Sequence, residues 1–284
     1  MATLPNPLPK LAADPSGRSL GLRLPPGRLI DATDDGPWRE PLLWHADKSA
    51  SPGSWAALGT PASRVGLLPV LVDLGGPQGG PERWQLSPAD TSYPGDHDAE
   101  DVLAECWEAM GDDGEEDGFD PELARLLAPF GADWPGLASA GSLTVEPGVC
   151  AARVADLLSG ADAGDRSHAG FKDPHLALVP ARRSADIPAA IGWTGPVNHE
   201  NDVARLCAVL RSWEDRFGIR VVALGFDTLV VSVAAPPAAR AEAEALAAEH
   251  FAFCPDNLTQ NGRDNLADYA ETLISERTWS FWWD

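Results

Sequence analysis

Cys254 and His250 are the residues whose types and spacing come closest to a catalytic pair. They lie four positions apart, so a helix that reaches residue 254 would place them on one face. A cysteine nucleophile needs such a base and an electropositive setting that lowers the pKa of its thiol. The sequence instead places Glu249 and Asp256 beside the pair, and Pro255 directly after the cysteine. These neighbours favour a structural, half-buried cysteine over a nucleophile.

His199, Glu200 and Asp202 form a second cluster of side chains that bind metals in other proteins. A complete metal site would need further ligands from elsewhere, such as Asp227 or Asp256. Acidic residues at the start of a helix already stabilise it, because they cap it and complement its dipole. The cluster is explained without a metal, so we predict neither a metal nor another cofactor.

Two of the 11 tryptophans are candidates for a pocket or an interface. Trp193 lies in a loop rich in glycine and proline. Trp282 alternates with Trp279 and Phe281 along a predicted last strand, so it points to the opposite face. Tryptophan combines a large apolar area with a polar N–H, which suits both kinds of site. We expect most of the other tryptophans in the core.

Other motifs of nucleophilic or phosphate chemistry are missing from the sequence. There is no Gly-x-Ser-x-Gly elbow to carry a serine triad. The glycine-rich segment 75–81 follows an apolar run but lacks the Gly-Lys-Ser/Thr ending of a phosphate-binding loop. Cys106, Cys150, Cys207 and Cys254 contain no Cys-x-x-Cys pair, and we expect them to be reduced.

The net charge of −22 comes from 43 acidic and 21 basic residues. Such a charge disfavours nucleic acid and anionic membranes as partners. No Lys or Arg lies between Arg83 and Arg125, and this stretch includes an acidic loop near 111–120 that we expect to stay solvated. Acidity by itself keeps a protein in solution, but it also complements a basic protein partner.

The sequence predicts no membrane contact and a cytoplasmic location. No apolar run reaches the ~18 residues that cross a bilayer. The first residues lack the basic and apolar regions of a secretory signal.

The chain divides into three regions by composition. Residues 1–28 are rich in proline and glycine and predict an extended arm. Residues 29–170 predict an N-terminal α+β region, in which 65–74 is a buried strand. Pro69 within that strand predicts an edge or a bulge. A Gly/Ala/Asp-rich stretch, 160–170, marks a linker, so 171–284 is predicted to be a separate C-terminal domain.

The C-terminal domain shows the clearest periodicity. We predict a strand at 175–180, a helix capped by Asn198 and ended by Gly218, a hairpin over 219–233, two more helices and a last strand at 278–283. The order β-α-β-β-α-α-β is α+β and similar to a split-βαβ, ferredoxin-like sandwich with an extra helix. In that arrangement the last strand lies beside the first, and helices cover Trp279, Phe281 and Trp283.

Five motifs in this domain carry a resemblance to a known family. They are Gly192-Trp193-Thr194-Gly195-Pro196-Val197-Asn198, Leu210-Arg211-Ser212-Trp213-Glu214-Asp215-Arg216-Phe217-Gly218, Gly225-Phe226-Asp227-Thr228-Leu229, Glu249-His250-Phe251-Ala252-Phe253-Cys254-Pro255-Asp256 and Trp279-Ser280-Phe281-Trp282-Trp283-Asp284. Residues 175–284 resemble, through these motifs in the same order, the bacterial family called domain of unknown function 4253. The resemblance implies an α+β domain at the C-terminus of a protein and implies no activity.

Two functions follow from these patterns. The first is a binding module whose acidic surface meets a basic protein, for example as an immunity- or inhibitor-like protein. The alternative is a small hydrolase or transferase with a site in a cleft between the two domains, near Trp193, His199, Asp227, Cys254 and Asp256. Because no catalytic motif is specific, we favour the binding module. The sequence sets no oligomeric state.

Overall fold

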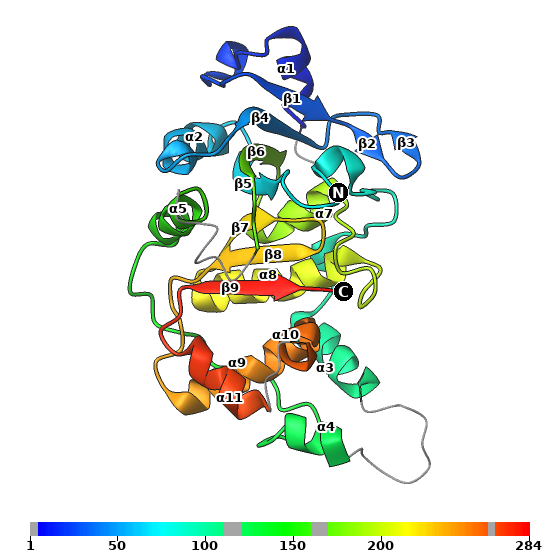
Figure 1. Ribbon diagram of the computed structural model, residues 1–284, viewed down its shortest axis with the longest axis vertical. Helices are drawn as coiled ribbons and strands as arrows, with labels where there is room; N and C mark the ends of the chain where they lie inside the picture. Colours follow the sequence, from blue (N-terminus) through cyan, green and yellow to red (C-terminus); the bar gives the residue numbers. More distant parts are fainter. Residues whose placement is uncertain (1–4, 111–120, 161–169, 261–264) are drawn as a thin grey trace.

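The structure is a computed structural model that describes residues 5–110, 121–160, 170–260 and 265–284. Its main sheet contains β1 (Gly27–Ile30), β4 (Leu43–Ser49), β5 (Leu67–Asp73), β6 (Pro174–Pro180), β7 (Arg220–Leu224), β8 (Thr228–Ser232) and β9 (Thr278–Trp282). A small separate ribbon pairs β2 (Ala32–Thr33) with β3 (Gly36–Pro37). The seven strands follow one another in the order β1-β4-β6-β5-β7-β8-β9 (Figure 1). Of these seven described strands, only β5 and β7 pair in parallel, so the sheet is mixed, and the predicted α+β class is confirmed.

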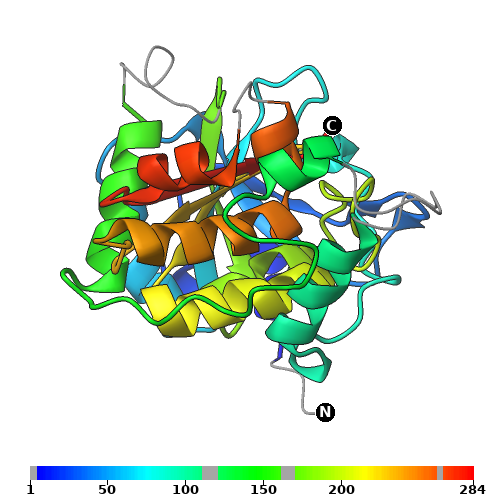
Figure 2. The same ribbon diagram turned by 90° about the horizontal axis from the view of Figure 1, so that it is seen from below.

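Helices cover both faces of the sheet. One layer contains α1 (Pro9–Ala13), α2 (Ser54–Ser63) and α5 (Pro147–Leu158). The other contains α3 (Ala99–Ala109), α4 (Pro121–Leu126), α7 (Ile187–Ile191), α8 (Val203–Phe217), α9 (Arg240–Phe253), α10 (Asp256–Thr259) and α11 (Leu266–Leu273). Short 3-10 turns are η1 (Arg18–Leu20), η2 (Pro81–Arg83), η3 (Pro94–Asp96) and η4 (Ser184–Asp186). Figure 2 shows this second layer from below, with α9 next to α11.

Alternation along the central strands builds a core on each side of the sheet. In β6, Leu176 and Leu178 join the core under α2 and α5, while Ala177 and Val179 join the core under α8 and α9. Successive side chains of a strand point to opposite faces, and a strand covered on both faces is apolar at almost every position. This explains why residues 176–180 of β6 form an unbroken apolar run.

The sheet takes strands from both sides of residue 170. β6 lies between β4 and β5, and it pairs antiparallel with both. Because both edges of β6 are occupied, no place beside it is left for β9, which pairs with β8. The prediction that the last strand lies next to the first, as in a ferredoxin-like sandwich, is therefore wrong.

Some details of the N-terminal region differ from the expectations. Within the arm at residues 1–28, the described part contains α1 and η1 and buries four leucines: Leu8, Leu11, Leu20 and Leu22. Pro69 lies in a central strand. The pairing of β5 with β7 involves only Leu71 and Val72, so Pro69 has no ladder on that side to interrupt. The acidic loop predicted near 111–120 lies outside the described residues.

The last strand is docked into the core, as its aromatic residues predict. Trp279, Phe281 and Trp283 are at most 2% exposed. The ring of Trp213 on α8 lies 5.6 Å from that of Trp279 and stacks at 5.5 Å on Phe281. The predicted covering of this face by helices is confirmed.

Helix α8 starts later than expected. Its N-cap is Asp202, which accepts a hydrogen bond from the Ala204 N–H, whereas Asn198 donates to the carbonyl of Asp284. The prediction of Asn198 as the cap is wrong, because the segment before Asp202 turns back towards the last strand. Gly218 ends the helix in the left-handed conformation, with φ +61°, as predicted.

Candidate functional site

Several of the residues predicted as a site contact the last strand. The thiol of Cys254 donates to the Trp282 carbonyl at 3.0 Å, and the Asp284 N–H donates to the Asp256 carboxylate at 3.1 Å. The backbone carbonyl of Asp227 accepts from the Trp283 N–H at 3.2 Å. These contacts hold the end of β9 in place.

Cys254 and His250 do not bond to one another. Cys254 is fully buried, and burial raises the pKa of its thiol well above the usual range. His250 is also fully buried; Nδ1 lies 2.9 Å from the Tyr269 hydroxyl. Burial, followed by the charge of Arg216, lowers the pKa of His250 to about 3. A protonated thiol and a base this weak do not form a nucleophile pair.

Trp193, His199 and Glu200 bond to neighbouring elements. Trp193 is 2% exposed and its Nε1–H donates to the Gly225 carbonyl at 3.0 Å. Nε2 of His199 lies 3.0 Å from the Ala252 carbonyl, and burial lowers its pKa. Glu200 pairs with Arg205 at 2.7 Å. Trp282 is half-buried on the face of β9 opposite Trp279 and Phe281.

Across the residues that the structure describes, no three His, Cys, Asp or Glu side chains are placed to hold a metal ion together. Within the same residues, no helix combines the length and apolar character needed to cross a membrane.

A different surface stands out by its charge. We call it the acidic face, and its members are exposed carboxylates on α3 and on the loop before it: Asp90, Asp96, Asp98, Glu100, Asp101, Glu105 and Glu108. The inner side of α3 buries Val102, Leu103 and Trp107. Asp98 caps the helix by accepting from the Glu100 and Asp101 N–H groups. Among the described residues, Arg205 is the one cation paired with this face, through Glu105.

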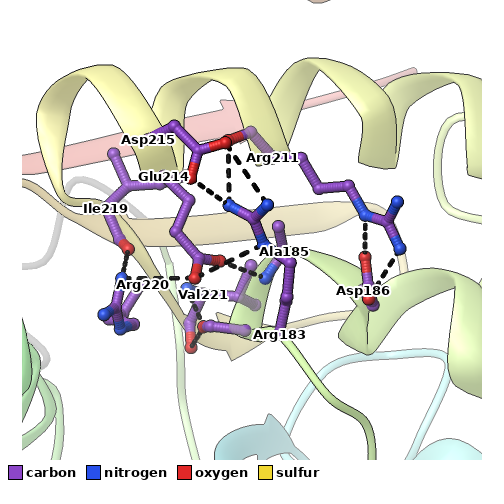
Figure 3. A network of polar contacts seen from close by, with 10 residues as sticks. Arg183, Ala185, Asp186, Arg211, Glu214, Asp215, Ile219, Arg220 and Val221 are labelled. Carbon is purple, nitrogen blue, oxygen red and sulfur yellow. Dashed lines mark hydrogen bonds and ion pairs between the residues drawn. The ribbon is translucent and has the colours of Figure 1, made fainter. Parts of the chain in front are cut away.

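Arg183 and Arg211 are paired with carboxylates in a network of polar contacts (Figure 3). Arg211 forms a bidentate pair with Asp186 at 2.5 and 2.9 Å, and its guanidinium lies 5.0 Å above the ring of Tyr93. Arg183 pairs with Asp215 at 2.6 Å. This network fixes Tyr93, which is 43% exposed, at the border of the acidic face without adding net positive charge.

The same border contains a hydroxyl–imidazole contact that the sequence patterns missed. The Oγ atom of Ser92 lies 2.6 Å from Nε2 of His97, and Oδ2 of Asp202 lies 3.8 Å from the same nitrogen. Asp202 is far from Ser92 and His97 in the sequence, and no motif relates the three. The one signal available in the sequence was a serine and a histidine within six residues of one another.

Together these features describe an α+β protein with a mixed sheet, helices on both faces of that sheet, and the acidic face on α3 and the loop before it. Residues 175–284 match the family model described as Domain of unknown function (DUF4253). The matched part of the chain starts at the second residue of β6. No curated protein and no solved structure gave a significant match.

Proposed function

We propose that this protein is a protein-binding module whose acidic face recognises a basic partner; an immunity- or inhibitor-like protein is one form of such a module. The observation that carries the proposal is the exposure of seven carboxylates on one helix and its preceding loop, with one paired arginine among the described residues. Complementary charge accelerates encounter and excludes partners of like charge.

The helix that carries most of the acidic face is packed against the core. Trp107 donates from Nε1 to the Ala132 carbonyl at 3.0 Å. Its ring packs against that of Phe251 on α9, with 5.8 Å between the ring centroids. A partner that docks on α3 therefore meets carboxylates fixed by a packed helix, which lowers the entropy lost on binding. Tyr93, exposed at the border, supplies the aromatic contact that interfaces favour.

The test is affinity capture with the tagged full-length protein, at low salt and at ~0.5 M salt, where surface charges are strongly screened. A first variant reverses three charges of the acidic face (Asp96→Lys, Glu100→Lys and Glu108→Lys). A matched control reverses three exposed acids near the β2–β3 ribbon (Asp34→Lys, Asp35→Lys and Glu40→Lys), with the same change in net charge.

We expect a stoichiometric basic partner that the wild type and the control retain at low salt, and that the acidic-face variant loses. The captured protein is then purified and titrated against all three proteins. Equal loss of binding in both variants would point to net charge alone and contradict the proposal. So would a partner that stays bound in ~0.5 M salt and binds the acidic-face variant with unchanged affinity.

The alternative, a small hydrolase or transferase near Cys254, has weaker support. The thiol is buried and donates to the backbone of the last strand, and His250 bonds to Tyr269. Neither side chain is presented to a substrate.

A further inference from the structure

We propose that Ser92 and His97 form a nucleophile–base pair that accepts an acyl group from small neutral or cationic esters. A reactive serine requires its hydroxyl within hydrogen-bond reach of a base, about 2.6–3.2 Å, and a third group that supports that base. The Ser92 Oγ to His97 Nε2 distance of 2.6 Å meets the first condition. Asp202 has its Oδ2 atom 3.8 Å from the same Nε2, which is too far for a hydrogen bond, so it supports the base only through its negative charge.

The serine is held by the fold rather than left on a loose loop. Its backbone N–H donates to Oδ1 of Asp202 at 3.1 Å, so the same carboxylate that caps α8 also positions Ser92. After it, the Asp96 N–H donates to the Tyr93 carbonyl at 2.9 Å, and Pro94 is buried. Fixed geometry of this kind is what separates a reactive serine from an ordinary exposed one.

His97 and Asp202 remain accessible, with 21% and 24% of their side chains exposed. With the proton on Nδ1, Nε2 of His97 accepts the Ser92 proton. The Asp202 carboxylate then stabilises the imidazolium that forms.

The proposed step conserves atoms and charge. Ser92 Oγ attacks the ester carbonyl carbon while its proton passes to Nε2 of His97. The leaving alkoxide takes that proton and departs as an alcohol, which leaves acyl-Ser92. Water, activated by the same imidazole, then releases a carboxylic acid and restores the serine.

Charge around the pair sets the substrate class. Asp96, Asp98, Glu200 and Asp202 all lie on the segments that carry or flank it. An anionic acyl donor is repelled by these carboxylates, whereas a neutral or cationic one is tolerated or attracted. The inference is independent of the proposed partner binding, because covalent labelling of Ser92 is measured without a partner.

The experiment exposes the full-length protein to a neutral fluorophosphonate probe and, separately, to p-nitrophenyl acetate, and locates the adduct by mass spectrometry. We expect modification at Ser92 in the wild type, none in Ser92→Ala, and labelling slower by about 100-fold or more in His97→Gln, the effect typical of losing a general base. Ser142→Ala, at an exposed serine away from the pair, is expected to react like the wild type.

Folding of each variant is checked by urea unfolding, so that a lost adduct reports on chemistry. Labelling of Ser92 at the same rate in His97→Gln would show an ordinary exposed hydroxyl and overturn the proposal. So would the absence of any adduct at Ser92 in the folded wild type.

Discussion

The Nη2 atom of Arg216 lies 2.6 Å from Oε2 of Glu249, whose side chain is completely buried. The same carboxylate accepts from Trp213 Nε1 at 2.8 Å and from the Ala138 N–H at 2.7 Å. One buried charge thus joins α8, α9 and the segment before α5. Removing one member of such a pair leaves the other charge desolvated and uncompensated.

Glu249→Gln keeps the size of the side chain and removes its charge. We expect the free energy of unfolding to fall by about 3 kcal/mol, because the Arg216 guanidinium stays in place without its counter-charge. Urea denaturation measures the change. Glu244→Gln, in the exposed pair with Arg240, is the control and is expected to have little effect. Equal effects of the two substitutions would contradict the role given to burial.

The stability of the protein is expected to fall as pH decreases below about 6.5. Burial lowers the folded-state pKa of His45, of His199 and of His250, the last to about 3. Unfolded histidines titrate near 6.5. Between pH 6.5 and the lower folded-state pKa values, the unfolded chain binds more protons than the folded protein. The contribution of these histidines to the free energy of unfolding is therefore complete above pH ~6.5 and is lost on acidification.

The measurement is the urea midpoint at pH 7 and pH 4.5. Each such histidine contributes up to about 1.4 kcal/mol per pH unit within its window. His250→Phe removes one of the three groups and preserves an aromatic ring in the cluster with Trp213 and Trp279. It should therefore lose less stability than the wild type over this interval. An identical loss would show that His250 is not protonated on unfolding.

The cysteines are expected to be unreactive in the folded protein. All four are free thiols; burial raises the pKa of Cys254 and Cys207, and that of half-buried Cys106 to about 11. At pH 7.5 we expect no thiol to react with Ellman's reagent within minutes, and all four to react after unfolding in denaturant. A fast thiol mapped to Cys254 would restore the cysteine nucleophile as a hypothesis.

Local patterns in the sequence predicted much of the C-terminal architecture. The apolar stripe from Val203 to Phe217 predicted a helix, and Gly218 predicted where that helix ends. Both signals depend only on residues that are close in the sequence. The aromatic residues of β9 predicted their own burial. Strand order was not predictable in this way, since the insertion of β6 between β4 and β5 depends on pairing across more than 100 residues.

The candidate sites show the same limit. Cys254 and His250 are close in sequence, so helical periodicity could suggest them as a pair. In the fold, however, each side chain is hydrogen-bonded to a different tertiary partner. Ser92 and His97 become a candidate pair only because Asp202, 110 residues after Ser92, anchors their loop. A composition-based argument could locate the acidic face, since a stretch without Lys or Arg is visible in the sequence itself.

Asn257 closes the free edge of the sheet. Its Nδ2 donates to the Ser280 carbonyl at 2.8 Å, next to the Cys254–Trp282 contact, so α10 and the turn before it satisfy carbonyls of β9 that face away from β8. An unpaired strand edge is a template for aggregation, and covering it is a common protection.

Asn257→Ala leaves the Ser280 carbonyl without this donor and is expected to cost about 2 kcal/mol of stability. Hydrogen exchange should accelerate at the amides of β9, whereas Thr259→Ala, on the exposed side of the same helix, should leave both quantities unchanged. Unaltered exchange in β9 of Asn257→Ala would mean that the edge is held by the aromatic core alone.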